Sequence, residues 1–348
     1  MIALVANGLD AVVRGGLGTR YTAAVMRVER AGTVVFERAY GTLDDAPRAP
    51  ATTVRTAFDL ASLTKVFVAT AALAAVSDGI IALDGSLERL LPEWRGTERA
   101  PITPAMLLAH IGGLQSGADY RTLLGEDVER FARERALVAI PGERVTYSDL
   151  GFIVLGTVLA RARGRSLAVV LSALADELAC EATAYRPRND DPAAVPATER
   201  DAWRGRVRGA VHDEKAFLMN GVAGHAGLFG TAHDVCRVAD LYLAVATERA
   251  PSGIVAPSLA RAAIEERGSD DVLRRGYGWA LKTSDANSCG AAMARATFGH
   301  TGFTGTCVWA DPTRDLCIAL LTNAVYFGRH DLRDVRAAVC DAAVAAYG

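Results

Sequence analysis

The segment Asp59-Leu60-Ala61-Ser62-Leu63-Thr64-Lys65 is followed by an apolar run from Val66 to Val76. This pattern predicts an extended segment that turns into a long buried helix, with Ser62 and Lys65 in the first turn. Side chains three positions apart share one face of a helix, so the hydroxyl and the amine can meet. A serine beside an amine that can lose its proton is a nucleophile with its own base. The pair is therefore a candidate catalytic centre.

Lysine is rare in this chain, which contains 3 Lys and 35 Arg. Arginine keeps its proton and cannot act as a base, whereas a buried lysine can. The structural alternative is a serine that caps the helix beside a lysine whose ammonium group reaches solvent. Because lysines are so few, one that lies three residues after a serine favours the catalytic interpretation.

Length and composition indicate an ordinary soluble globular protein. The 348 residues can form a large core, and we expect two lobes. Hydrophobic residues make up 51% of the chain, charged residues 22%, and the net charge is −2. The sequence contains no basic patch of the kind that would indicate a nucleic-acid partner. Its composition does not determine an oligomeric state.

The sequence predicts a cytoplasmic protein without a membrane span. No apolar run is long enough to cross a bilayer. The stretch from Met1 to Arg20 lacks an early positive charge, and Asn7 and Asp10 interrupt its apolar residues, so it is a poor signal peptide. The six cysteines are scattered without C-x-x-C or metal spacing, which is typical of a reducing compartment. We expect neither a metal nor a cofactor.

Strand patterns near both ends of the chain and helix patterns in its middle predict an α+β fold. The expected sheet is antiparallel, flanked by N- and C-terminal helices, and interrupted by a mainly helical lobe. The sheet domain would comprise residues 1–61 and 235–348, the lobe residues 62–234, with the active site between them. The predicted helices are 2–14, 104–110, 125–138, 149–163, 167–178, a capped helix from 231 to 245, and 331–347; the predicted strands are 21–30 and 33–40 as a hairpin, 276–281, 296–301, 305–310 and 315–322.

Two further motifs follow the serine in the chain. Tyr147-Ser148-Asp149 lies in a loop that leads into a helix, and His300-Thr301-Gly302-Phe303 ends a strand beside a glycine turn. In this order S-x-x-K, Y-S-D and H-T-G resemble the serine β-lactamase and penicillin-binding-protein superfamily. The tyrosine motif is similar to the class C β-lactamase branch, which includes family VIII esterases, D-alanyl-D-alanine carboxypeptidases, D-aminopeptidases and acyltransferases. Segments 211–214 and 223–229 resemble the penicillin-binding protein 4B-like group.

The resemblance implies a role for each motif. Ser62 would attack an ester or amide carbonyl and become acylated, while Lys65, deprotonated by burial, would take or relay the serine proton. Tyr147 would be the second proton carrier, and Asp149 would hold Lys65 and a polar group of the substrate. The oxyanion would lie between the backbone N–H groups of Ser62 and Phe303.

The third motif departs from the β-lactamase pattern. His300 replaces a lysine, so that a fixed positive charge becomes a titratable one beside Thr301 and Gly302. Asp149 in place of asparagine adds negative charge at the same mouth. Both changes disfavour an anionic substrate without excluding one. The segment Lys282-Thr283-Ser284 superficially resembles K-T-G but lacks the glycine, and we reject it.

Several residues have structural interpretations beside the functional ones. His110 and the two glycines after it suggest a helix stop behind the nucleophile. His212, Asp213 and His225 could suggest a metal site, but their spacing favours hydrogen bonds that shape loops. The walls of the pocket are expected from the helical lobe, around four aromatic residues, which are Trp94, Tyr120, Trp203 and Phe217.

Together the motifs predict a serine hydrolase with a small-molecule ester or amide substrate, most simply a carboxylesterase for small or medium acyl esters. One alternative is a D-alanyl-D-alanine carboxypeptidase, a D-aminopeptidase or a weak β-lactamase. An acyltransferase would differ only in the nucleophile that resolves the acyl-enzyme. A non-catalytic binding relative is the alternative from another class, and the intact Ser62, Lys65 and Tyr147 argue against it.

Overall fold

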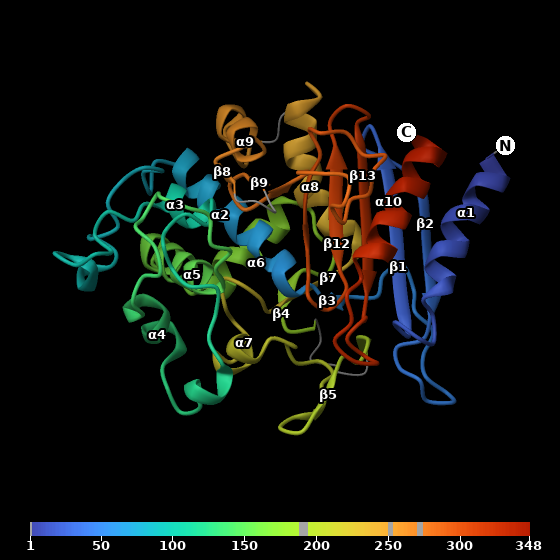
Figure 1. Ribbon diagram of the computed structural model, residues 1–348, viewed down its shortest axis with the longest axis horizontal. Helices are drawn as coiled ribbons and strands as arrows, with labels where there is room; N and C mark the ends of the chain where they lie inside the picture. The colour runs from blue at the N-terminus through green and yellow to red at the C-terminus, as the bar shows by residue number, and fades with distance from the viewer. Residues whose placement is uncertain (1, 188–193, 250–252, 270–273) are drawn as a thin grey trace.

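An eight-stranded antiparallel sheet forms one half of the protein, seen in a computed structural model that describes residues 2–187, 194–249, 253–269 and 274–348 (Figure 1). The strand order is β2-β1-β13-β12-β11-β10-β9-β8, so strands from both ends of the chain are neighbours. The strands are β1 (Ala23–Arg30), β2 (Thr33–Gly41), β8 (Gly268–Ser269), β9 (Arg274–Arg275), β10 (Ala280–Leu281), β11 (Phe298–Thr301), β12 (Cys307–Asp311) and β13 (Leu316–Thr322). The predicted hairpin at the N-terminus is confirmed.

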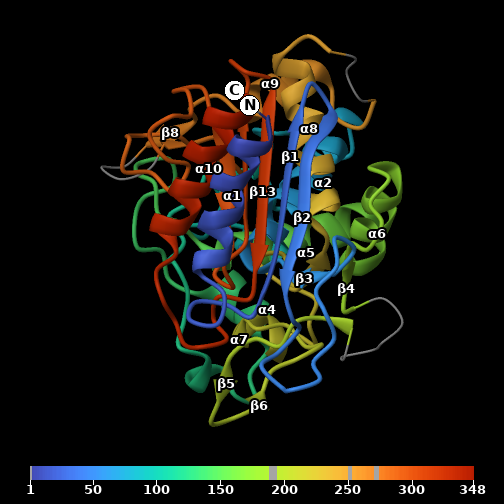
Figure 2. The same ribbon diagram turned by 90° about the vertical axis from the view of Figure 1, so that its right-hand side faces the viewer.

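Helices cover both faces of this sheet. Helices α1 (Ile2–Gly15) and α10 (Arg333–Tyr347) lie side by side on one face (Figure 2). Helix α8 (Ala232–Ala246) packs on β13, β12 and β1 from the other face. A sheet covered on both faces needs apolar side chains on both, and every residue of β13 is buried accordingly.

The pleat of β13 divides its side chains between two cores. Leu316, Ile318 and Leu320 belong to the core under α1 and α10. Cys317, Ala319 and Leu321 alternate with them and belong to the larger core that continues into the helical lobe. In the sequence the strand was recognisable as a short β-rich run that follows turn residues.

The helical lobe is built around α2 (Thr64–Ser77), which contacts α5, α6, α8 and α9. Eleven of its residues are buried, and its apolar side chains face all directions, as expected for a helix enclosed by protein. Ser62 precedes this helix in a 3₁₀ turn, η1 (Ala61–Leu63), rather than lying within its first turn as predicted. The other helices are α3 (Pro104–Leu108), α4 (Val128–Glu134), α5 (Asp149–Arg163), α6 (Leu167–Glu177), α7 (Glu214–Leu218) and α9 (Pro257–Ala263), with 3₁₀ turns η2 (Pro92–Trp94) and η3 (Tyr120–Leu123).

Side-chain caps set the start of the helices that border the site. The Ser148 hydroxyl accepts from the N–H of Gly151 and begins α5. At α8 the predicted capping box is present, with Thr231 and Asp234 bonding to each other's backbone N–H. Asp234 also accepts from the backbone N–H groups of Glu181 and Ala182, and thereby ties the lobe to α8.

A small second sheet links the nucleophile segment to the glycine-rich loop. Its order is β3 (Phe58–Asp59), β7 (Leu228–Gly230) and β4 (Ala184–Tyr185). The pairing of β3 with β7 places residues 221–227 beside the start of α2. A third sheet pairs β5 (Arg200–Asp201) with β6 (Gly205–Arg206). These short strands lack the length that makes a strand visible in sequence.

The predicted strand at 276–281 is wrong over most of its length. Only Ala280 and Leu281 pair, and residues 276–279 form the turn that joins β9 to β10. The N–H of Gly276 donates to the carbonyl of Trp279, and Gly278 has φ +78° and lies against Ala69 of α2.

The domain boundaries at 61/62 and 234/235 stay a prediction. Among the described residues, no helix combines the length and the apolar character needed to cross a membrane.

Candidate active site

Ser62 lies in a tightly held turn between β3 and α2. The residue before it, Ala61, has φ +47°, a left-handed conformation that is costly for a residue with a Cβ. Its N–H donates to Oδ1 of Asp59 at 2.8 Å, and Oδ2 of Asp59 accepts from the N–H of His212 at 2.6 Å. The buried Asp59 carboxylate thus holds the strained turn and leaves Ser62 half-exposed.

Lys65 is completely buried, and three acceptors surround its ammonium group. Its Nζ donates to Oγ of Ser62 at 3.0 Å and to the carbonyl of His225 at 3.0 Å. It also lies 2.8 Å from Oδ1 of Asp149. These three contacts use all the donors of an ammonium group.

The charge of Lys65 differs from the expectation. Burial lowers the pKa of Lys65, but the neighbouring Asp149 and Tyr147 outweigh burial and raise that pKa above its usual value. Burial likewise raises the pKa of Asp149, and the attraction of Lys65 reverses this, so that the pKa of the carboxyl is lowered. The pair is therefore an ammonium and a carboxylate. The deprotonated Lys65 expected from burial and the helix N-terminus is wrong for this resting arrangement, because Asp149, which was expected to hold Lys65, also raises its pKa.

Tyr147 lies between two cations. Nζ of Lys65 and Cζ of Arg275 are each 4.9 Å from the centroid of its ring. The His110 ring packs on another side of it, with the centroids 4.7 Å apart. The sequence position of His110 had suggested a place behind the nucleophile. The structure instead places its ring against Tyr147. Burial lowers the pKa of His110 well below its usual value, so this ring is neutral.

The turn after β11 is fastened to the nucleophile segment. The hydroxyl of Thr304 donates to the carbonyl of Asp59 at 2.8 Å, and that of Thr306 donates to the carbonyl of Leu60 at 3.1 Å. A Cβ on Gly302 would lie 2.1 Å from Oγ1 of Thr306 and 2.6 Å from the Leu60 carbonyl oxygen. Only glycine fits this approach, so the two segments have a fixed relative position.

His300 is buried in β11 and carries no charge. Its Nδ1 lies 2.9 Å from the carbonyl of Thr301, which assigns the ring proton to Nδ1. Burial, together with Arg275 and Lys65, lowers the pKa of His300 to about 3. The titratable positive charge predicted here is therefore absent at neutral pH, and the cation beside this position is the guanidinium of Arg275.

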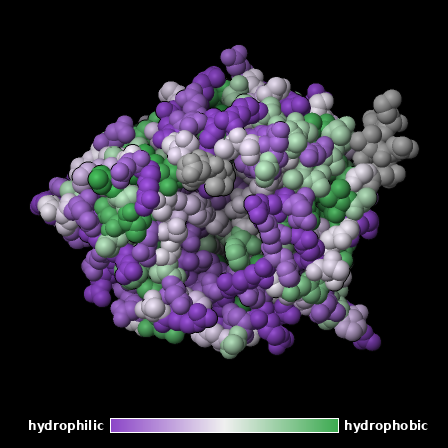
Figure 3. Space-filling model, viewed as in Figure 1, coloured by the Kyte–Doolittle hydropathy of each residue, from purple (hydrophilic) through white to green (hydrophobic). Residues whose placement is uncertain are grey.

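A cavity of about 570 Å³ opens in front of Ser62. Its lining contains Tyr147, His300, Thr301, Gly302 and Phe303 as predicted neighbours of the nucleophile. Its other walls come from the sheet side, chiefly Arg275, Trp309, Val325, Arg329, Leu332 and Arg336. Figure 3 shows a hollow in the middle of this face of the molecule, rimmed mainly by hydrophilic residues.

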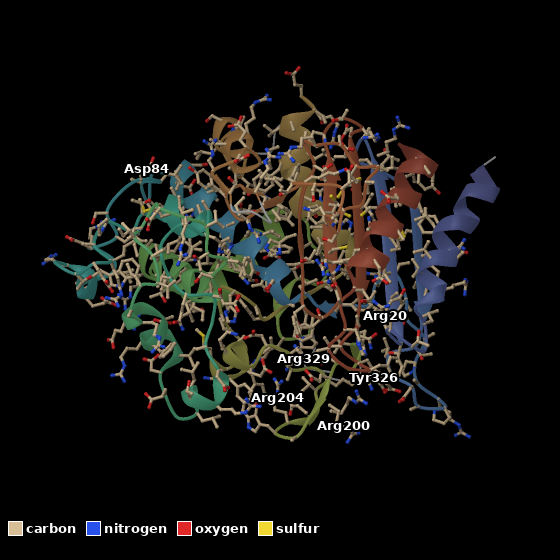
Figure 4. The ribbon with its side chains drawn as sticks, viewed as in Figure 1. Arg20, Asp84, Arg200, Arg204, Tyr326 and Arg329 are labelled. Carbon is tan, nitrogen blue, oxygen red and sulfur yellow. The ribbon has the colours of Figure 1, made fainter. Side chains whose placement is uncertain are left out.

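The four aromatic residues predicted to form the pocket walls are absent from this lining. Trp94 is buried in the helical lobe, where its indole N–H donates to the carbonyl of Arg133. Trp203 stacks on Tyr120 and meets the edge of Phe217, at centroid distances of 5.0 and 5.3 Å. Figure 4 shows their neighbour Arg204 near α7, with Arg329 between it and the sheet. Sequence spacing could not reveal which face of the lobe these residues occupy.

A second lysine completes the charged cluster behind Ser62. Nζ of Lys215 lies 3.4 Å from Oδ2 of Asp149 and 3.2 Å from Oδ2 of Asp213. Oδ1 of Asp213 in turn lies 2.8 Å from Nε2 of His225. Asp149, Asp213 and His225 are close enough together to hold a metal ion, but the Lys215 ammonium already lies against both carboxylates. Lys215 was not among the predicted site residues, although the rarity of lysine in this chain was an available signal.

A family comparison agrees with this geometry. Residues 9–342 match the model of the beta-lactamase family. The chain belongs to the beta-lactamase family. The predicted resemblance to the serine β-lactamase and penicillin-binding-protein superfamily is thereby confirmed, and this family member is a serine hydrolase.

Proteins similar to this beta-lactamase family member include hydrolases that differ in the bond they are named for. The chain is 30% identical over 371 residues to the esterase EstB of Burkholderia gladioli, covering 94% of this chain and 92% of EstB. It is 29% identical over 353 residues to an N-acetylmuramyl-L-alanine amidase of Bacillus subtilis, covering 90% and 80% of the two chains. The structure of EstCE1, described as a hydrolase with promiscuous acyltransferase activity, superposes with a TM-score of 0.77 at 22% identity, over 100% of this chain and 99% of EstCE1. The α+β fold prediction is confirmed.

Proposed function

We propose that this protein is a carboxylesterase that cleaves small or medium acyl esters through an acyl-enzyme on Ser62. The observation that carries the proposal is the 3.0 Å hydrogen bond between Lys65 and Oγ of Ser62 at the mouth of the cavity. A hydroxyl held by an ammonium group presents its oxygen in one orientation toward a bound carbonyl. The 30% sequence identity to the esterase EstB, over 94% of this chain, supports the same reaction class.

Tyr147, in its phenolate form, would accept the proton of Ser62 as the serine attacks the carbonyl carbon, and would thereby become a neutral phenol. The cations of Lys65 and Arg275 each lie 4.9 Å from the centroid of the tyrosine ring, and both would stabilise the negative charge of the phenolate before it takes the proton. The same tyrosine would then protonate the departing alcohol. In the second step a water molecule attacks the ester carbonyl of acylated Ser62, again with Tyr147 as the proton carrier, and the free acid leaves.

The N–H groups of Ser62 and Phe303 would bind the oxyanion. Neither amide has a hydrogen-bond partner among the described residues, and the bonds from Thr304 and Thr306 to the nucleophile segment hold the two segments together. Two such preorganised donors stabilise the negative oxygen of the tetrahedral intermediate. Gly302 would be required for this spacing.

The substrate proposal rests on the character of the cavity. The neutral His300 ring and the apolar side chains of Trp309, Val325 and Leu332 favour an uncharged acyl group. The volume of about 570 Å³ suits a small or medium acyl ester.

A second candidate is an amide or peptide substrate with a carboxylate, as in a D-alanyl-D-alanine carboxypeptidase. Its specific support is the pair of buried guanidinium groups, Arg275 and Arg336, in the lining of the same cavity. Arginine is well suited to bind carboxylates. The relatedness to an amidase is compatible with this candidate, and the fold likeness to EstCE1 keeps acyl transfer to another alcohol as a third. We also propose a cytoplasmic location, because the six cysteines are scattered along the sequence without C-x-x-C spacing and all are buried.

Substrate hydrolysis by matched proteins tests the proposal. Wild type and Ser62→Ala would be incubated with p-nitrophenyl acetate, p-nitrophenyl butyrate, nitrocefin and a D-alanyl peptide. We expect the wild type to hydrolyse the two esters fastest, and Ser62→Ala to be inactive. A fluorophosphonate label should modify Ser62, as located by mass spectrometry. A label on another residue, or equal inertness of both proteins, would refute the proposed function.

A further inference from the structure

Asp149 belongs to a closed ring of polar contacts behind the nucleophile. Lys65 contacts Asp149, Asp149 contacts Lys215, Lys215 contacts Asp213, and Asp213 contacts His225. The carbonyl of His225 closes the ring by accepting from Nζ of Lys65. Its members come from α2, α5, α7 and the loop before β7, so only the folded chain assembles it.

We propose that Lys215 is a positioning residue, which binds the second oxygen of Asp149 and balances the negative charge that Asp149 places on Lys65. This inference rests on the proposed function of Ser62 and Lys65, and concerns what fixes the charge balance of that site. Lys215 lies in the lining of a neighbouring cavity and contacts Asp149 from the side opposite to Lys65. We therefore assign it no contact with the substrate.

The geometry of Asp149 carries the argument. One oxygen lies 2.8 Å from Lys65 and the other lies 3.4 Å from Lys215, so two ammonium groups share one carboxylate. The Lys215 ammonium group repels the Lys65 ammonium group while Asp149 attracts both. The net electrostatic stabilisation of protonated Lys65 is therefore smaller than it would be with Asp149 alone. Asparagine at position 149 would carry no charge and would need no such partner. Lys215 thus offsets the charge that the aspartate brings to the site.

Other charged and titratable groups near Lys65 bear on the balance and stay unchanged in the test. They are Tyr147 from the loop before α5, His110 from the turn after α3, Arg275 from β9, His300 from β11, and Asp213 and His225 from the segments on either side of α7. Asp213 supplies the second anion of the ring, since Oδ2 contacts Lys215. The two lysines and the two aspartates of the ring contribute equal and opposite formal charges.

The pH dependence of kcat/KM for p-nitrophenyl butyrate tests the inference. Lys215→Met removes a positive charge, so the titrating groups of the site should bind their protons more tightly. The acidic limb of the profile, where kcat/KM declines as the pH falls, should therefore move to higher pH by about one unit. Activity below that limb should then fall about tenfold. Asp149→Asn removes a negative charge and should move the limb to lower pH. The double variant should lie near the wild type, because the two charges are removed together.

Two conservative controls separate charge from structure. Lys215→Arg keeps the positive charge and should keep the wild-type limb. Lys282→Met removes the remaining lysine of the chain, whose Nζ donates to the carbonyls of Ala291 and Met293 away from the ring, and it should leave the limb unmoved. If Lys215→Met fails to fold, the opposite shift of Asp149→Asn and the behaviour of Lys215→Arg still decide.

Lysine NMR provides a readout that does not need activity. With ¹³C at Cε, the three lysines give three signals, which the Lys215→Met and Lys282→Met variants assign. The Lys65 signal should remain that of an ammonium group at pH 8 in the wild type, and should titrate at lower pH in Asp149→Asn than in the wild type. If the wild type is active and the acidic limb of Lys215→Met lies at the wild-type pH, the inference about Lys215 is overturned while the proposed function stands. An inactive, unlabelled wild type would overturn the proposed function, while the NMR comparison still tests the ion-pair balance.

Discussion

The N–H of Ser148 donates to Nδ1 of His110 at 3.0 Å, and both groups are buried. The carbonyl of His110 accepts from the N–H of Thr146 at 2.8 Å. His110 therefore binds the backbone on both sides of Tyr147, while its ring packs on the tyrosine ring. This arrangement requires φ +59° at His110, which few residues with a side chain adopt. The histidine thus holds the loop that carries the proposed proton carrier.

Replacing His110 should lower both stability and turnover. His110→Ala leaves the buried N–H of Ser148 without an acceptor, and we expect a loss of about 1–3 kcal/mol in the free energy of unfolding. Tyr147 would be less well placed, so kcat should fall more than KM rises. His110→Asn, which tolerates positive φ and keeps a side-chain acceptor, should recover part of both.

Urea unfolding and steady-state kinetics measure these effects. His233→Ala is the matched control, since the ring of that histidine lies on the surface, 3.4 Å from the carbonyl of Ala179. It should change neither quantity. Unchanged turnover in folded His110→Ala would contradict the positioning role.

Adding one methyl group at Gly302 should impair catalysis. The Cβ would lie 2.1 Å from Oγ1 of Thr306 and 2.6 Å from the carbonyl oxygen of Leu60, so the turn must move away from Ser62. Because the N–H of Phe303 moves with it, we expect Gly302→Ala to lower kcat about 10²–10³-fold, the usual effect of losing one oxyanion donor. Gly15→Ala is the control, since a Cβ there meets nothing within 4 Å. Gly302→Ala with wild-type kcat would argue against the proposed oxyanion site.

A lysine at position 300 should change the preference between neutral and anionic substrates. His300 is neutral at pH 7, so His300→Lys adds a positive charge to the lining of the cavity. A charge-assisted hydrogen bond to a carboxylate should raise the relative kcat/KM for the anionic substrate about tenfold or more. The matched substrates are mono-p-nitrophenyl succinate and p-nitrophenyl butyrate. His300→Gln should leave their ratio near that of the wild type, and an unmoved ratio in His300→Lys would contradict this account of the position.

Buried neutral histidines should make the fold sensitive to acid. The pKa of His300 is about 3 in the folded protein and about 6.5 when the chain unfolds, so below pH 6.5 the unfolded state binds more protons. Stability should therefore fall as the pH falls from 6.5 toward 3, by up to about 1.4 kcal/mol per pH unit for this residue. Urea unfolding from pH 6.5 to 4.5 measures the slope. His300→Gln should show a smaller slope, and equal slopes would mean that His300 is protonated in the folded state.

Most long elements could be predicted because each has a clear periodic pattern. Helix α5 begins and ends where predicted, since Ser148 caps it and Gly164 ends it with φ +62°. Strand β13 was recognisable as a short β-rich run after a turn. The two-residue strands β8 and β9 could not be found, because their pairing depends on neighbours rather than on a repeating pattern. The glycines at 276 and 278 were assigned to a strand, although they belong to a turn.

The sequence by itself determined the family, the α+β architecture and the serine that lies one helical turn from a rare lysine. These depend on local spacing and on the order of motifs, which survive in one dimension. Only the tertiary structure decided the charge of Lys65, the neutral state of His300 and which residues line the cavity. Each of these depends on the distance between side chains far apart in the chain, such as Lys65 with Asp149 and His300 with Arg275. Because electrostatic energies follow distance and burial, no pattern of residue types contains them.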